Sequence, residues 1–333
     1  MSGTNTMDMR TQPVVVICGA TAGVGRATAH RFAAAGYRVG LLARDEQALA
    51  ATEEELSVHG VATLAASVDV ADAEAVLEAA QKIEETLGPV TVWINCAMVT
   101  VFSPVHRLAA EEIHRVTSVT YLGTVHGTLA ALELMMPRNR GVIIQVGSAL
   151  AYRAIPLQAA YCGAKFAVRG FTDSLRCELL HQHSDIRVCM VQLPAINTPQ
   201  FDWARNKLGK RPQPVPPIHD PDVAARAIFS VVRRTPRELW LGAASLKAIV
   251  GTCLMPGLLD RMLARGACSG QMTDEPDDGQ RPDNLFSPEV PVHRTRGRFS
   301  GRSRNAALAL SSTQVSALLL ATGGLVAVVL LLF

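Results

Sequence analysis

The chain has 333 residues, 49% of them hydrophobic, and a formal net charge of +3 at pH 7. This length accommodates one large α/β domain with an appendage, and the small net charge gives no reason to expect a nucleic-acid partner. Seven dispersed cysteines without a C-x-x-C pair argue against a structural zinc site or a disulfide framework and indicate a reducing compartment. Residues 1–12 are polar, so we expect a flexible N-terminus without a secretory signal, and no metal site is expected.

From Pro13 to Leu193, short runs rich in β-forming residues alternate with longer runs of helical pattern. The predicted strands are residues 14–18, 38–43, 62–67, 90–95, 141–147 and 187–193. The predicted helices are residues 23–35, 45–58, 71–87, 111–136 and 157–181. Such alternation requires right-handed crossovers, and nearly continuous apolar strands are typical of a parallel sheet covered on both faces. We therefore predict a single α/β domain over residues 13–270, a doubly wound, Rossmann-type parallel sheet.

The pattern loosens after Leu193, and we assign residues 194–270 to the substrate region of the same domain. A helix is predicted over residues 222–233, because Asp220 and Pro221 form a good N-cap and first turn. Residues 238–241 are a candidate edge strand. Residues 271–305 are polar and rich in Pro, Asp, Gly and Arg, so we predict a disordered linker there.

Residues 306–333 contain no charged side chain, and we predict a transmembrane anchor in this segment. As a helix, Val315–Phe333 would span roughly 28 Å, close to the ~30 Å hydrocarbon core of a bilayer. Five arginines lie between residues 294 and 304, which by the positive-inside tendency keeps the catalytic domain in the cytoplasm. The alternative is a soluble protein whose apolar tail is a buried or partner-binding helix.

A glycine-rich loop follows the first predicted strand. Gly19, Gly23 and Gly25 enclose Thr21 and Val24 and precede the first predicted helix. Glycines there permit a tight turn and close approach of the backbone to a pyrophosphate, which then faces the free N–H groups of a helix N-terminus. The loop therefore predicts nucleotide binding.

Three further residues suit proton transfer at a carbonyl or alcohol oxygen. Tyr161 and Lys165 are four residues apart in a predicted helix, so they share one face. A neighbouring cation favours the phenolate and lowers the pKa of a phenol toward neutral pH. Ser148 ends a predicted strand and supplies a hydroxyl donor.

With these motifs in matching order over residues 13–200, the chain resembles the short-chain dehydrogenase/reductase family. The residues that carry the resemblance are Gly19, Gly23, Gly25, Asp69, Val70, Asn95, Cys96, Ala97, Ser148, Tyr161, Lys165 and residues 194–198. The resemblance implies that Tyr161 is the general acid/base, that Lys165 lowers its pKa and holds the nicotinamide ribose, and that Ser148 binds the substrate oxygen. Thr120 stands where the family commonly has an asparagine that supports a proton relay to the lysine.

The resemblance also implies a cofactor site. Asp69, with Val70, would contact the adenine, and Asn95 and Ala97 would line the adenosine side. The residues expected at the nicotinamide end are Pro194, Ile196 and Thr198.

The end of the second strand bears on which nucleotide is bound. Ala43 is followed by Arg44, and a neutral residue followed by a guanidinium suits a 2′-phosphate. NADP(H) is therefore favoured, while Asp45 leaves NAD(H) possible.

The sequence thus predicts a membrane-tethered NADP(H)-dependent oxidoreductase that interconverts a carbonyl and an alcohol on a lipophilic small molecule. The alternative function is a nucleotide-binding scaffold with weak or no turnover. The resemblance further suggests a homo-oligomer formed through residues 111–136 and 157–181.

Overall fold

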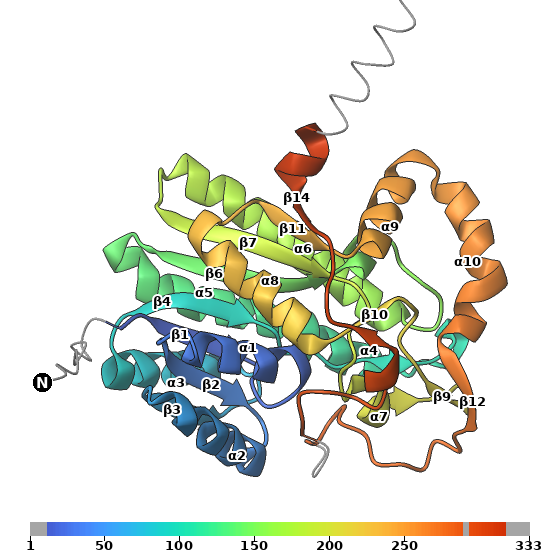
Figure 1. Ribbon diagram of the computed structural model, residues 1–333, viewed down its shortest axis with the longest axis horizontal. Helices are drawn as coiled ribbons and strands as arrows, with labels where there is room; N and C mark the ends of the chain where they lie inside the picture. The colour runs from blue at the N-terminus through green and yellow to red at the C-terminus, as the bar shows by residue number, and fades with distance from the viewer. Residues whose placement is uncertain (1–11, 289–292, 318–333) are drawn as a thin grey trace, which may run out of the picture.

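A computed structural model describes residues 12–288 and 293–317, and its centre is an eight-stranded sheet (Figure 1). The strand order is β14-β11-β7-β6-β4-β1-β2-β3, and the pairs are parallel except that of β14 with β11. The strands are β1 (Val14–Cys18), β2 (Arg38–Ala43), β3 (Thr63–Ser67), β4 (Val90–Asn95), β6 (Gly141–Ser148), β7 (Ile186–Leu193), β11 (Glu238–Leu241) and β14 (Ala309–Ser311). The predicted Rossmann-type fold is confirmed.

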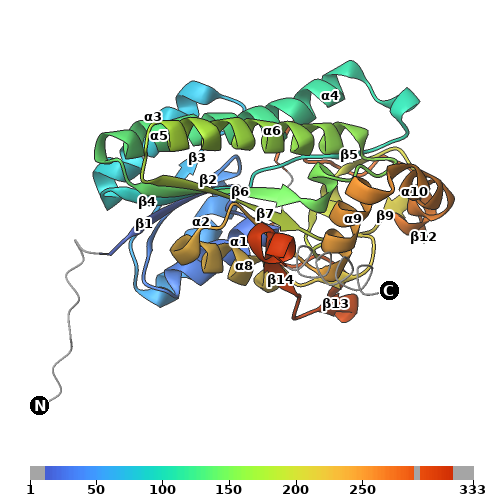
Figure 2. The same cartoon turned by 90° about the horizontal axis from the view of Figure 1, so that it is seen from above.

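Helices cover both faces of the sheet (Figure 2). The helices are α1 (Gly23–Ala33), α2 (Glu46–Leu56), α3 (Ala73–Leu87), α4 (Ala110–Thr117), α5 (Gly123–Met135), α6 (Ala159–His181), α7 (Gln200–Trp203), α8 (Pro221–Arg234), α9 (Ala243–Leu254) and α10 (Pro256–Gly270). Figure 2 shows α3, α5 and α6 on one face and α1, α2 and α8 on the other. Two apolar clusters fill these interfaces, and fully buried strand residues such as Ile17 and Ile144 belong to the cluster that also holds Phe32 of α1. Burial on both faces explains why the strands read as continuous apolar runs.

Aspartate side chains fix where three of these helices begin. Asp45 accepts a hydrogen bond from the N–H of Ala48 at 2.8 Å, and Asp72 and Asp220 cap α3 and α8 in the same way. Each cap satisfies backbone donors that the first turn of a helix leaves free.

The single helix predicted over residues 111–136 is interrupted. A π-helical turn, Ser118–Leu122, separates α4 from α5. The Thr120 hydroxyl donates to the carbonyl oxygen of Val99 at 3.1 Å and accepts from its N–H at 3.2 Å. These contacts hold the widened turn against the loop after β4. A π-helical turn adds one residue to a single helical turn, and the hydrophobic periodicity of the sequence is too coarse to reveal it.

The disordered linker predicted over residues 271–305 was wrong for the part that the structure describes. We call residues 281–288 and 293–304 the C-terminal arm. Leu285 is fully buried, and Arg281 bonds to the Asp277 carboxylate and to the carbonyl oxygen of Ala204 at 2.8 Å. Figure 1 shows the arm passing along the lower edge of the molecule before it turns up to β14. The segment was predicted to be disordered because its composition is polar and rich in proline. Composition does not show that its polar groups have hydrogen-bonding partners on the rest of the domain.

Three short strand pairs lie outside the eight-stranded sheet. The pairs are β5 (Val101–Phe102) with β8 (Arg205–Asn206), β9 (Lys210–Pro212) with β12 (Met272–Pro276), and β10 (Ile218–His219) with β13 (Ser303–Arg304). The last two join the substrate region to residues that follow position 270.

The predicted anchor does not begin at residue 306. Ala309–Ser311 form β14 and pair with β11, so the candidate edge strand β11 is an internal strand of the sheet. Residues 318–333, which hold most of the predicted anchor, lie outside the described residues. Over positions 12–288 and 293–317, the structure contains no helix with the length and apolarity needed to span a bilayer.

Candidate active site

The carboxyl ends of the central strands open onto one pocket of about 450 Å³. The chain leaves β1 and β4 in opposite directions along the sheet, and ligands of doubly wound folds bind at such a point. The predicted site residues that line the pocket are Gly19, Thr21, Gly23, Val24, Gly25, Arg44, Asp69, Val70, Ala97, Ser148, Tyr161, Lys165, Pro194, Ile196 and Thr198.

The three glycine positions of the loop after β1 leave no room for a side chain. Gly19 and Gly23 have positive φ angles of 84° and 54°. A Cβ atom on Gly25 would lie 1.9 Å from the carbonyl oxygen of Gly19, and one on Gly23 would lie 2.9 Å from Cγ2 of Thr198. The missing side chains allow a ligand to approach the backbone closely where α1 begins, which fits a dinucleotide phosphate.

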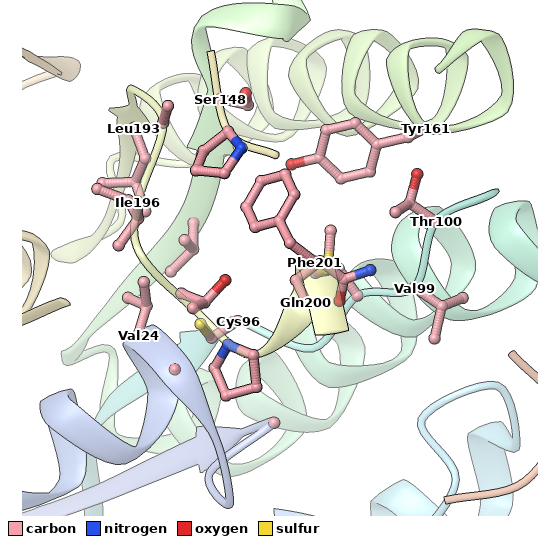
Figure 3. Close-up of a pocket in the computed structure, with 18 of the residues that line it drawn as sticks. Val24, Cys96, Val99, Thr100, Ser148, Tyr161, Leu193, Ile196, Gln200 and Phe201 are labelled. Carbon is pink, nitrogen blue, oxygen red and sulfur yellow. The ribbon is translucent and has the colours of Figure 1, made fainter. Parts of the chain in front are cut away.

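Ser148, Tyr161 and Lys165 meet at the centre of the pocket. Ser148 ends β6, and its Oγ accepts a hydrogen bond from the N–H of Leu150 at 3.1 Å. Figure 3 shows the phenol of Tyr161 pointing from α6 into the cavity. Lys165 is buried and donates from Nζ to the carbonyl oxygen of Val146 at 2.7 Å, with Nζ 5.6 Å from the centre of the Tyr161 ring.

Burial shifts the pKa values of Tyr161 and Lys165. Burial raises the pKa of Tyr161 above its ordinary value of 10, and a hydrogen bond with Ser148 only partly opposes this. Burial also lowers the pKa of Lys165 to about 8. Burial therefore sets the net direction of the Tyr161 pKa shift, and the effect of Lys165 on the phenol stays a prediction. At neutral pH Tyr161 holds its proton, which is the state that donates to a carbonyl oxygen.

Arg44 and Asp69 line the pocket beyond the ends of β2 and β3, and Arg115 contacts Asp69. Asp69 accepts from the N–H of Ala71 at 3.0 Å and pairs with Arg115 at 2.5 Å. Burial by itself would raise the pKa of Asp69, but these hydrogen bonds and the charges of Arg115 and Arg44 hold it below its ordinary value. Arg44 donates to the carbonyl oxygens of Asn284 at 2.6 Å and Phe286 at 3.0 Å. Arg115 lies in α4 and belongs to no motif that the sequence displays.

Apolar side chains also line the pocket. They come from the loop after β4, the residues after β6, the α7 region and α10. They include Phe102, Leu150, Ile155, Phe201, Trp203 and Leu263. Phe201 lies beside the Tyr161 phenol in Figure 3. Half of these residues, Phe201, Trp203 and Leu263, belong to the predicted substrate region.

Two predicted site residues do not line the pocket. Asn95 is buried and donates to Gln145 Oε1 at 2.9 Å and to Thr128 Oγ1 at 3.1 Å, so it joins β4 to α5 and β6. Thr120 is fully buried and its hydroxyl is engaged by the backbone of Val99. A motif places these residues near the site, but only packing decides which way each side chain is turned.

The C-terminal arm adds residues that the sequence analysis missed. Asn284, Pro288 and His293 line the pocket, and the N–H of Gly23 donates to the carbonyl oxygen of Arg294 at 3.0 Å. Isolated apolar residues such as Leu285 within the polar segment were the available signal for a packed arm.

Comparison with known proteins agrees with this site. Residues 13–208 match the short chain dehydrogenase family. An uncharacterized oxidoreductase, YxnA, of Bacillus subtilis (strain 168) is 30% identical over 303 residues, covering 90% of this chain and 85% of that protein. A 3-ketodihydrosphingosine reductase of Bos taurus is 29% identical over 192 residues, covering 56% of this chain and 57% of that protein.

Among solved structures, an alcohol dehydrogenase from the archaeon Thermococcus sibiricus complexed with 5-hydroxy-NADP is similar, with a TM-score of 0.59 and 27% identity. The match covers 69% of this chain and 95% of that one. With the glycine loop, the Ser148, Tyr161 and Lys165 cluster and these likenesses together, the chain belongs to the short chain dehydrogenase family and is an NAD(P)-dependent oxidoreductase.

Proposed function

We propose that the protein is an NADP(H)-dependent oxidoreductase that interconverts a carbonyl and an alcohol on a lipophilic substrate. The observation that carries the proposal is the position of Tyr161 and Ser148. They lie where the part of the pocket lined by the glycine loop meets the part lined by apolar side chains.

Ser148, Tyr161 and Lys165 have different roles in the reduction. Ser148 holds the substrate oxygen next to the Tyr161 hydroxyl, and Tyr161 donates its proton to that oxygen as the carbonyl becomes an alcohol. The bound nicotinamide cofactor supplies the hydride in this direction and accepts it in the other. Lys165, charged at pH values below about 8, stabilises the negative charge left on the phenol oxygen.

The apolar side chains that line the pocket favour a lipophilic substrate. Phe102 and Phe201 present aromatic surface in the pocket, and burial of apolar ligand surface against such a lining is favourable. The Bos taurus relative is named for the reduction of a ketone, 3-ketodihydrosphingosine, which agrees with carbonyl chemistry on this scaffold.

The positive charge near Asp69 favours NADP(H) over NAD(H). Arg44 and Arg115 both stand near Asp69 at the adenosine end, and no carboxylate occupies position 43 or 44 at the end of β2. Two guanidinium groups favour a 2′-phosphate, and the Thermococcus sibiricus neighbour binds an NADP analogue.

The test is turnover of medium- and long-chain ketones and alcohols with NADP(H) and NAD(H). We expect Tyr161→Phe to lose roughly 100- to 10,000-fold in kcat, the usual worth of a general acid, while still binding cofactor. Tyr37→Phe is the matched control, because Tyr37 packs against Phe32 on the far side of the sheet. Equal activity of Tyr161→Phe and the parent on a turned-over substrate would contradict the mechanism, and a protein that binds NADPH without turnover would favour a scaffold.

We also propose that residues 318–333 tether the domain to a membrane with the domain on the cytoplasmic side. The segment is uncharged and apolar, and arginines precede it in the C-terminal arm. Cell fractionation of the full chain and of a chain lacking residues 318–333 tests this. An unchanged distribution after the deletion would overturn the tether.

A further inference from the structure

The α9–α10 hairpin is rich in apolar residues, yet few of them are buried. None of the 15 residues of α10 is buried, and α9 buries only Ser245 and Ile249. Four large apolar side chains of the hairpin are instead exposed. They are Leu254, Met255, Leu258 and Met262, with exposed fractions of 70%, 53%, 49% and 58%. Contiguous exposed apolar surface of this kind marks an interaction site.

The apolar residues occupy two different sides of α10. Leu263 and Ala267 line the substrate pocket, whereas Leu258 and Met262, one turn apart, face outward. A helix that is apolar on more than its core-facing side is normally covered on both sides. The protein covers only the inner side of this one.

The charges of the hairpin favour an anionic surface. Residues 243–270 carry three cations, Lys247, Arg261 and Arg265, against one carboxylate, Asp260. That carboxylate is already paired with Arg153. Apolar side chains bordered by unpaired basic residues are the pattern of helices that lie in the interface of a membrane containing anionic lipids.

The described part of the chain ends on the same side of the molecule as the hairpin turn. In Figure 1, β14 leads the chain to the upper side of the molecule, where the turn between α9 and α10 also lies. Residues 318–333 follow directly in sequence and contain no charged residue.

We propose that the outer face of the α9–α10 hairpin, centred on Leu254, Leu258 and Met262, docks on a lipid bilayer containing anionic lipids. Docking places the hairpin that carries Ala248 and Leu263, two residues of the pocket lining, at the lipid surface, so that a lipophilic substrate enters from the bilayer. The docking does not depend on the proposed reaction, whereas the route of substrate entry rests on it.

The chain has two exposed cysteines that can report on docking without new labelling sites. Cys253 lies in the hairpin, and Cys177 lies on α6. A fluorophore is attached to one of them, with the other and Cys268 replaced by serine, and the full chain is reconstituted in phosphatidylcholine–phosphatidylserine vesicles with brominated acyl chains. We expect strong quenching at Cys253 and little at Cys177. Absence of quenching at Cys253, or equal quenching at both positions, overturns the proposal. Absence of quenching at Cys253 is also the result expected if a second copy of the chain or residues 318–333 cover the hairpin.

A second experiment tests substrate entry. The double variant Leu258→Glu, Met262→Glu should lose several-fold in kcat/KM for a long-chain ketone dissolved in the vesicles and keep the parent rate on a short, water-soluble ketone. Val58→Glu is the matched control, because Val58 is 79% exposed and lies at the end of α2. An unchanged rate on the vesicle ketone, or an equal loss on both ketones, overturns the entry route. If the parent turns over neither ketone, the proposed reaction fails while the quenching result still decides docking.

Discussion

Arg44, directly after β2, donates a hydrogen bond from Nη2 to the carbonyl oxygen of Asn284 at 2.6 Å, across 240 residues of sequence. The same guanidinium bonds to Phe286, and Arg115 donates to the carbonyl oxygen of Leu285 at 2.9 Å between them. The two arginines proposed for the adenosine end of the cofactor site therefore hold the C-terminal arm in this structure.

Arg44→Ala should weaken NADPH binding much more than NADH binding. Loss of a charge-assisted hydrogen-bonding group costs about 1.5–3 kcal/mol, which is roughly 10- to 100-fold in Kd. Fluorescence titration of both cofactors measures this, with Arg138→Ala as the control because Arg138 pairs with Glu84 away from the pocket. An equal rise in Kd for NADPH and NADH would mean that Arg44 acts only through the arm.

Lys165→Met should stabilise the folded protein at pH 7 while it abolishes activity. The pKa of Lys165 falls from its ordinary 10.5 to about 8 on burial, so below pH 8 the folded protein carries a desolvated charge. Between pH 8 and 10.5 the folded state binds fewer protons than the unfolded chain, and this penalty declines as pH rises.

We expect Lys165→Met to raise the free energy of unfolding by roughly 1–3 kcal/mol at pH 7, with the gain shrinking toward pH 10. Denaturant unfolding at both pH values measures the gain, and Lys82→Met provides an exposed-lysine control. A pH-independent difference would show that desolvation of the ammonium is not the cause.

Thr120→Val should cost stability more than catalysis. Valine keeps the shape of threonine but leaves the N–H and carbonyl of Val99 without this partner, at a cost of about 2 kcal/mol or more. Thr120→Ser keeps the hydroxyl and should recover most of that loss. Thermal unfolding and kcat below the transition are the measurements. A loss of kcat of about 100-fold or more with unchanged stability would restore the proton-relay role of Thr120.

Asn197→Ala should loosen the C-terminal arm. The buried Asn197 side chain accepts from the N–H of Phe299 at 3.0 Å and donates to Ser300 Oγ at 3.1 Å. Losing both contacts favours local opening by about 2 kcal/mol, so trypsin should cleave roughly 30-fold faster at the arginines of residues 294–298. Limited proteolysis measures this, and Asn305→Ala, which removes an exposed side chain, should leave the rate unchanged. A similar rate for Asn197→Ala and the parent would mean that other contacts hold the arm.

The sequence by itself determined the sheet and the central chemistry. Apolar runs define β1, β2 and β4 at the predicted bounds, because strands buried on both faces tolerate little else. The glycine loop, Ser148, Tyr161 and Lys165 were also identified, since each depends on a residue type at a strand end or on a fixed helical spacing. These are local constraints, and local constraints are visible in sequence.

Tertiary structure alone decided the rest. The same residue types can face the pocket or the core, and packing turns Asn95 and Thr120 inward. Burial, which a sequence does not report, raises the pKa of Tyr161. The C-terminal arm is ordered because Arg44 and Asn197 meet it from positions far away in the chain. Contacts of this range depend on the whole fold being in place, so no local pattern could have specified them.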